Sequence, residues 1–173
     1  EHANLLYKLP PYEFSGKKVL KARNKYYIVD AALRNAVLLK GEDVVTDPIE
    51  MGRIVETTIL RHFYAYHYRE TPRITYWRDP RTQLEVDIIV KGPGFMRPIE
   101  VKYREDAGLS PKSGVAAFCA SEAPPQAFFV TKNDEDFSVQ HLEGIDTEFL
   151  RVPAHVLCYL LGQAERLLWG TQD

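Results

Sequence analysis

The sequence predicts a mixed α/β domain, and the order of its hydrophobic patterns favours this class. An amphipathic helix is expected over residues 47–66, and three strands separated by short turns follow it. A second helix and a further strand come next, which gives the order helix, three strands, helix, strand. At 173 residues the chain is long enough to build one hydrophobic core. Its 45% hydrophobic and 27% charged residues are ordinary for a globular domain.

The N-terminal segment predicts a β-hairpin followed by a short helix. Residues 5–9 and 19–29 have strand-like patterns, and the turn is expected at residues 15–18. Asp30 is expected to cap a helix over residues 31–39.

Five basic residues gather on this hairpin, and no acid lies between residues 15 and 29. They are Lys17, Lys18, Lys21, Arg23 and Lys25. One interpretation is a wing that contacts nucleic-acid phosphates, because clustered lysine and arginine release counterions from nucleic acid. The other is a solvated hairpin face, and both interpretations stay open. The net charge of -2 gives no overall attraction to DNA, so any attraction must come from such a local patch.

The long helix has the clearest start signal in the chain. Asp47 is a good N-cap, Pro48 suits the first helical position, and Glu50 stands where a capping-box acid belongs. The apolar stripe expected to face the core consists of Ile54, Val55, Ile59 and Phe63. Glu56 lies beside this stripe, where an unpartnered charge is costly. On helix evidence alone, Glu56 is interpreted as an acid that reaches solvent from the edge of the core.

The remaining elements follow from turn residues and apolar runs. Turns are expected at residues 79–81 and 92–94, which carry proline or glycine. The predicted elements are strands over 74–77, 84–91 and 96–103, a helix over 111–120, a strand over 127–131, a weak strand near Val139 and a helix over 153–169.

The turn at residues 92–94 fixes a register for its two strands. If the turn is centred between Pro93 and Gly94, Asp87 lies opposite Glu100 and Glu85 lies opposite Lys102. Because strand side chains alternate with period 2, these four polar residues share one face. The opposite face is expected to be a core face made of Val86, Ile88, Ile99 and Val101.

This register predicts a metal-dependent chemistry. Opposed carboxylates destabilise a sheet, so Asp87 and Glu100 require water, Lys102 or a cation as compensation. Mg²⁺ accepts one or two carboxylates while keeping several waters, and a bound ion activates water and stabilises phosphoryl charge. Lys102 could orient that water or neutralise the transition state. The alternative is an ordinary wet sheet face, which shows the same alternation without any metal.

Other signals exclude several function classes. Cys119 and Cys158 stand in apolar surroundings, which predicts reduced thiols in a cytoplasmic protein. No apolar stretch reaches the roughly 20 residues needed to cross a bilayer. The Gly-rich phosphate loop is absent, so ATP is not bound by that route. His62 and His67 are five residues apart and are interpreted as residues at the boundary of the core.

The motifs in their order resemble a known domain. They are Gly-Arg-Ile-Val-Glu at 52–56, Tyr-Trp-Arg at 76–78, Glu-Val-Asp-Ile-Ile-Val at 85–90 and Pro-Ile-Glu-Val-Lys at 98–102. This set resembles an uncharacterised C-terminal domain that follows the ATPase module of many bacterial and archaeal AAA-type ATPases. That domain is similar to the PD-(D/E)XK nuclease superfamily. Residues 25–30 and 33–36 resemble the stretch that leads into it. Thr57 and Ala32 depart from the usual Asn and Gly.

The resemblance implies an α/β restriction-endonuclease-like core over residues 47–173. Residues 1–46 would be a hairpin-and-helix appendage, the remnant of a winged-helix linker to an upstream P-loop ATPase module. Asp87 and Glu100 would bind Mg²⁺ or Mn²⁺, Lys102 would be the catalytic lysine, and Glu56 would be a supporting acid.

The expected function is metal-dependent DNA cleavage by the C-terminal domain of an ATPase. The expected partners are DNA and the ATPase module, without a membrane, and an oligomer stays open. The alternative is a catalytically silent module that binds DNA or a protein partner and regulates the ATPase. Cleavage of RNA or of a small phosphodiester also stays open.

Overall fold

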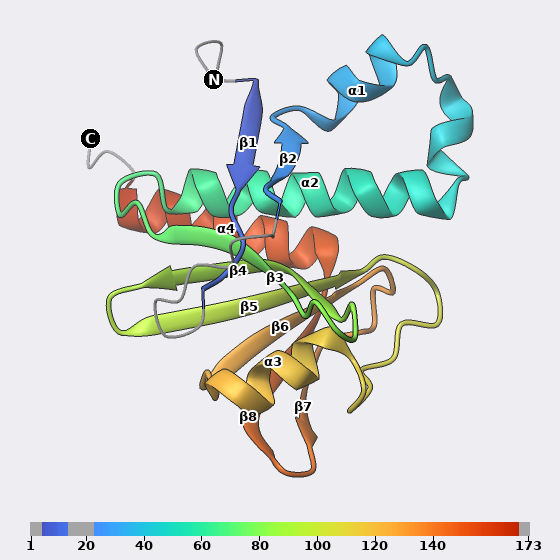
Figure 1. Ribbon diagram of the computed structural model, residues 1–173. Coiled ribbons are helices and arrows are strands. Elements are labelled where there is room, and N and C mark those ends of the chain that lie inside the picture. Colours follow the sequence, from blue (N-terminus) through green and yellow to red (C-terminus); the bar gives the residue numbers. More distant parts are fainter. Residues whose placement is uncertain (1–4, 14–22, 170–173) are drawn as a thin grey trace.

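Residues 5–13 and 23–169 are described by the computed structural model of the protein (Figure 1). A six-stranded sheet has the order β3-β4-β5-β6-β8-β7, and a separate two-stranded sheet pairs β1 with β2. The elements are β1 (Leu6–Leu9), β2 (Lys25–Ile28), α1 (Ala31–Val37), the 3₁₀ helix η2 (Glu42–Val45), α2 (Pro48–Tyr66), β3 (Arg73–Arg78), β4 (Glu85–Gly92), β5 (Phe95–Lys102), α3 (Gly114–Glu122), β6 (Gln126–Thr131), β7 (Ser138–Leu142), β8 (Ile145–Pro153) and α4 (Ala154–Trp169).

Helices cover both faces of the large sheet, so the fold has three layers. In Figure 1, α2 and α4 lie side by side over one face, and α3 lies against the other. The first core joins α2 residues such as Phe63 to Leu157 of α4 and to Val90 of β4. The second core joins Phe118 of α3 to Phe129 and Phe149. The predicted α/β class and the order helix, three strands, helix, strand are confirmed.

The second half of the sheet contains a strand that the sequence patterns do not predict. The strands β3, β4 and β5 are antiparallel neighbours, whereas β5, β6 and β8 run parallel. In β8, Thr147, Phe149 and Val152 are buried, but Asp146 and Glu148, which flank Thr147, are exposed. These acids interrupt the apolar run, which hides the strand from pattern analysis. The weak strand near Val139 is β7, which pairs with β8.

The helix starts follow their caps, with one displacement. The Asp30 side chain accepts a hydrogen bond from the Ala32 N–H at 2.8 Å, as predicted for α1. In α3 the cap is Ser113, whose side chain accepts from the Ala116 N–H at 3.2 Å. The helix therefore starts at Gly114 rather than at residue 111.

The N-terminal hairpin is present and is fastened to the large sheet. Strands β1 and β2 pair antiparallel, with Tyr7 opposite Tyr27. Leu9 is fully buried in the core shared with α2 and α4. Just beyond β1, the Tyr12 N–H donates to the Tyr76 carbonyl at 2.6 Å. The predicted turn at residues 15–18 and the strand residues 19–22 lie outside the described residues.

Two further findings concern the cysteines and the lengths of the helices. Cys119 and Cys158 form no disulfide, as predicted. Within the described ranges, no helix combines the length and apolarity that a membrane crossing requires.

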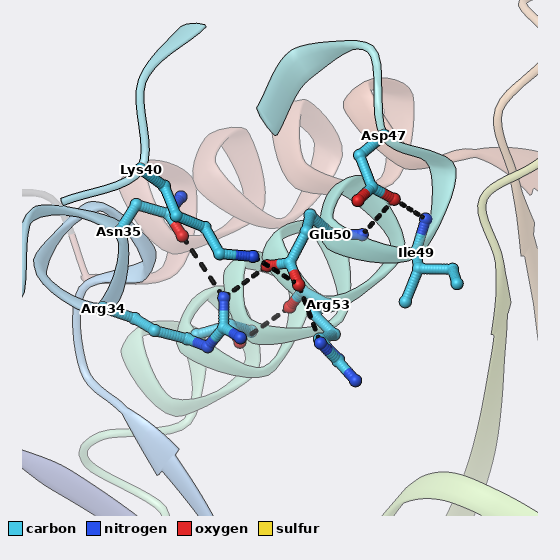
Figure 2. Close-up of polar contacts among 8 residues, drawn as sticks. Arg34, Asn35, Lys40, Asp47, Ile49, Glu50 and Arg53 are labelled. Atoms are coloured by element: carbon cyan, nitrogen blue, oxygen red, sulfur yellow. Dashed lines mark hydrogen bonds and ion pairs between the residues drawn. The ribbon is translucent and has the colours of Figure 1, made fainter. Parts of the chain in front are cut away.

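A charge cluster around Glu50 fastens α1 and the following loop to α2 (Figure 2). Asp47 caps α2 as predicted, since its carboxylate accepts from the Ile49 N–H at 2.9 Å. The predicted capping box is wrong in its second half, because the Glu50 side chain does not return to the cap. It forms ion pairs with Arg34 of α1, with Lys40 at 2.9 Å and with Arg53 at 2.8 Å. Three cations compete more strongly for this carboxylate than one backbone N–H does.

Replacement of Glu50 by Gln should destabilise the protein in a pH-dependent way. Hydrogen bonds from Lys40 and Arg34 lower the pKa of Glu50 to about 2. The ionised carboxylate therefore stabilises the fold above its unfolded pKa of about 4.3, and that contribution disappears as the pH falls toward 2. Thermal unfolding of Glu50→Gln should occur several degrees lower than that of wild type at pH 7, with a smaller gap at pH 3. The exposed Glu42→Gln is the control, and a gap independent of pH would contradict the account.

Gly114 permits α3 to approach β4 more closely than any other residue could. A Cβ at this position would lie 1.9 Å from the Glu85 carbonyl oxygen, which is backbone and cannot swing away. Gly114→Ala should lower the free energy of unfolding in urea by about 1–3 kcal/mol, although alanine is the better helix former. Gly162→Ala in α4 meets nothing within 4 Å and should be neutral or stabilising. Equal effects of the two variants would refute the close approach.

Candidate active site

The β4–β5 hairpin has the register that the turn predicts. Pairs run from Gly92 opposite Phe95 to Ile88 opposite Ile99. Gly94 has a positive φ of 77°, which closes the turn without strain. The ladder stops one pair short of Asp87 and Glu100, so the two acids lie where the strands cease to pair.

A bulge on the other side of β4 changes the directions of its side chains. Thr75 pairs with Ile89 but Trp77 pairs with Val86, so Tyr76 faces both Asp87 and Ile88. An extra residue of this kind bends a strand and redirects its side chains.

The core face predicted for the hairpin is therefore wrong in one member. Val86 packs against α3, whereas Ile88, Ile99 and Val101 pack on the face covered by α2 and α4. Simple alternation had placed all four together.

The Asp87 side chain takes over the role of the missing ladder bond. Its Oδ2 accepts a hydrogen bond from the Val101 N–H at 2.8 Å. This bond orients the carboxylate across the gap between β4 and β5. Asp87 is therefore held by the backbone of the strand that carries Glu100 and Lys102.

Glu100 is buried and only half satisfied. Its side chain is 4% exposed, and its Oε1 forms an ion pair with the Lys102 ammonium. The buried Oε2 has no hydrogen-bond partner. A buried carboxylate oxygen without a partner is costly, and such positions often belong to functional sites.

The electrostatics of the acids show an excess of negative charge. Burial raises the pKa of Asp87 well above its usual value, and the charges of Glu100 and Glu56 raise it further against Lys25 and Lys102. Burial also raises the pKa of Glu100, although Lys102 opposes the shift.

Lys102 shows the complementary effect. Burial disfavours its ammonium, but the charges of Glu100 and Asp87 outweigh burial and raise its pKa. Added positive charge would stabilise the ionised form of both acids.

Glu56 reaches this cluster from α2. Its side chain is 22% exposed, and its Oε1 accepts a hydrogen bond from the Tyr27 hydroxyl. Lys25 contacts both Glu56 and Glu85 of β4, which places Glu56 beside the sheet, and the charge of Glu56 raises the pKa of Asp87 and of Glu100. The structure thus brings together all four predicted site residues.

Two residues of β2 also belong to the cluster and were not predicted as parts of it, Lys25 and Tyr27. The Lys25 ammonium forms an ion pair with Glu85 and lies 3.8 Å from Glu56. Tyr27 is two positions further along β2 and so shares its face. The spacing of Lys25 and Tyr27 could have shown that they share one face of β2. No local sequence pattern shows that this face packs against the site.

The basic residues predicted on the hairpin differ in their surroundings. Lys25 was predicted to contact nucleic acid, but its ammonium is engaged by carboxylates. Arg23 is exposed. Lys17, Lys18 and Lys21 lie outside the described residues. Nucleic-acid contact by this hairpin stays a prediction.

The donor set suits a hard divalent cation that keeps water ligands. Within residues 5–13 and 23–169, no group of three or more His, Cys, Asp or Glu side chains is arranged to hold a metal ion. Asp87 and Glu100 provide two carboxylates, and the unpartnered Glu100 Oε2 is an available ligand atom. Mg²⁺ and Mn²⁺ can bind through one or two carboxylates. His67 bonds Glu70 at 2.8 Å instead.

A cleft of about 590 Å³ opens next to this cluster without including its acids. Tyr103 and Arg104, which directly follow Lys102, form one wall, and Met51 of α2 forms another. Lys132 lines it from the end of β6. The cleft therefore lies at the carboxyl ends of parallel strands, where α/β proteins usually bind ligands.

Fold and site together define a mixed α/β protein with a cluster of acids and lysines between a sheet and its covering helix. The model of a family described as a domain of unknown function, DUF4143, matches residues 51–150. The match covers more than half of the 173 residues, so the chain belongs to this family. Neither a curated protein nor a solved structure matches the chain.

The matched segment contains Glu56, Asp87, Glu100 and Lys102, but it begins at residue 51, after the N-terminal hairpin. Lys25 and Tyr27 therefore enter the site from outside the matched segment.

Neutralising Asp87 should stabilise the protein in the absence of metal. Because its pKa is raised on folding, ionisation of Asp87 costs stability as the pH rises through the unfolded and then the folded pKa. Asp87→Asn keeps an oxygen for the Val101 N–H and removes this charge. Its unfolding temperature should exceed that of wild type by a few degrees at pH 7, and the gain should shrink toward pH 4. Asp146→Asn, on an exposed position of β8, is the control. A destabilised Asp87→Asn at pH 7 would contradict the charge account.

Proposed function

We propose that this domain binds Mg²⁺ or Mn²⁺ at Asp87 and Glu100 and hydrolyses phosphodiester bonds of DNA. The observation that carries the proposal is the buried Glu100 carboxylate. One of its oxygens is paired with Lys102 and the other has no partner, while a second acid stands beside it. An isolated structural ion pair needs neither the second acid nor the unpartnered oxygen.

The fold supports the proposal at a second level. One helix, three antiparallel strands, a helix and a parallel strand are the elements expected of a restriction-endonuclease-like core. The acids on β4 and β5 and the lysine two residues after Glu100 match the PD-(D/E)XK pattern in order. In this proposal, Glu56 is the supporting acid from the first core helix.

Each residue of the chain would have a distinct role in hydrolysis. A bound Mg²⁺ would supply Lewis-acid stabilisation and a water of lowered pKa. Asp87 would be a metal ligand, and the hydrogen bond from the Val101 N–H would fix the orientation of its carboxylate. Lys102 would leave Glu100 for the scissile phosphate, where its ammonium stabilises negative charge that develops in the transition state.

The direct test is cleavage of labelled DNA with Mg²⁺ or Mn²⁺. Wild type should release product, and Lys102→Ala should be slower by about 100-fold or more, because one transition-state charge partner is lost. Lys112→Ala, at an exposed position before α3, is the matched control and should retain wild-type rates. Wild-type cleavage no faster than that of Lys102→Ala would contradict the proposal.

One observation favours a second function from another class. The acids are already partly neutralised by Lys25 and Lys102 inside the protein. This arrangement would suit a catalytically silent module that binds DNA or a protein partner and regulates an attached P-loop ATPase. Titration calorimetry separates the two functions, since a silent module gives no divalent-ion heat that depends on Asp87 and Glu100.

A further inference from the structure

We propose that Lys25 acts as a built-in cation that competes with the divalent metal for the acids of this site. This inference rests on the proposed function, because the competing ion is the metal assigned to Asp87 and Glu100. Lys25 lies outside the segment that the family model matches, and the quantity that it would control is the affinity of the site for the metal.

The contacts of Lys25 place its charge among the site acids. The ammonium is ion-paired with Glu85, the first residue of β4, and lies 3.8 Å from Glu56 on α2. The ring of Tyr76 faces it with its centroid 5.1 Å away, a distance at which an aromatic face attracts a cation. Its side chain is 23% exposed, so solvent screens this charge only in part.

The hairpin that carries Lys25 holds it in place. Tyr27, on the same face of β2, donates its hydroxyl to Glu56. The neighbouring strand β1 stacks Tyr7 on Tyr64 of α2, with ring centroids 4.3 Å apart. Tyr76 donates its hydroxyl to the Arg23 carbonyl. Lys25 is therefore a fixed cation, and its attraction to the acids persists when a metal approaches.

Competition follows from the charges. The Lys25 ammonium acts on Glu56 and Asp87, and the Lys102 ammonium acts on Asp87 and Glu100. A divalent cation entering between Asp87 and Glu100 is repelled by Lys25 and shares the acids with it. Removal of Lys25 leaves the acids with one ammonium partner and so favours the metal. A purely structural lysine predicts the opposite sign, because its loss would disorganise the acids and weaken metal binding.

The experiment is calorimetric titration of Mn²⁺ into wild type, Lys25→Met and Lys25→Arg. Lys25→Met should bind Mn²⁺ on the order of tenfold more tightly than wild type, and Lys25→Arg should bind like wild type because it keeps the charge. Lys40→Met is the matched control. Lys40 also neutralises a carboxylate of α2, but that carboxylate belongs to Glu50, outside the cluster of site acids. Lys25→Gln replaces Lys25→Met if circular dichroism shows that the latter does not fold.

The outcomes separate this inference from the proposed function. If wild type binds Mn²⁺ and Lys25→Met binds equally or more weakly, the inference is wrong and the metal site stands. If only Lys25→Met binds, the inference is supported and Lys25 blocks the site. If neither binds, both the inference and the metal site fail. The added heat in Lys25→Met must disappear when Asp87→Asn is combined with it.

Discussion

The end of the β4–β5 ladder is the feature on which the rest of the site depends. The hairpin pairs regularly as far as Ile88 and Ile99, and the Asp87 carboxylate then replaces the backbone as partner of the Val101 N–H. The Asp87 side chain thus links β4 to β5 at a position where their backbones no longer pair directly. This arrangement leaves room for an acid on each strand, and it orients Asp87 through the backbone of the strand that carries Glu100.

The surrounding fold stabilises this arrangement from three directions. The helix α2 covers the sheet and brings Glu56 to the acids, while its own start is fixed by Asp47 and by the cations around Glu50. On the other face, Gly114 lets α3 rest against the backbone of Glu85. The hairpin of β1 and β2 adds Lys25. These elements therefore offset the free energy that is lost when several acids are placed close together in the fold. Such a cost is expected where function conflicts with stability.

Much of this could be predicted from sequence, because the signals were local. The cap at Asp47, the glycine-proline turn at residues 92–94 and period-2 alternation gave the long helix, the hairpin and its register. The bulge opposite Tyr76 could not be predicted, since it depends on pairing with β3, and it moved Val86 to the other core. β8 was missed because exposed acids break its apolar pattern. Lys25 looked like a phosphate contact because only tertiary docking turns it toward Glu85 and Glu56.

The central claim is that Asp87 and Glu100 share a divalent metal ion. The most direct measurement is a crystal structure of the protein grown or soaked with Mn²⁺, with anomalous data to identify the metal. The account predicts an anomalous peak between the two carboxylates, with the Glu100 Oε2 as a ligand. A structure without that peak, in which Glu100 remains paired with Lys102 alone, would contradict the claim.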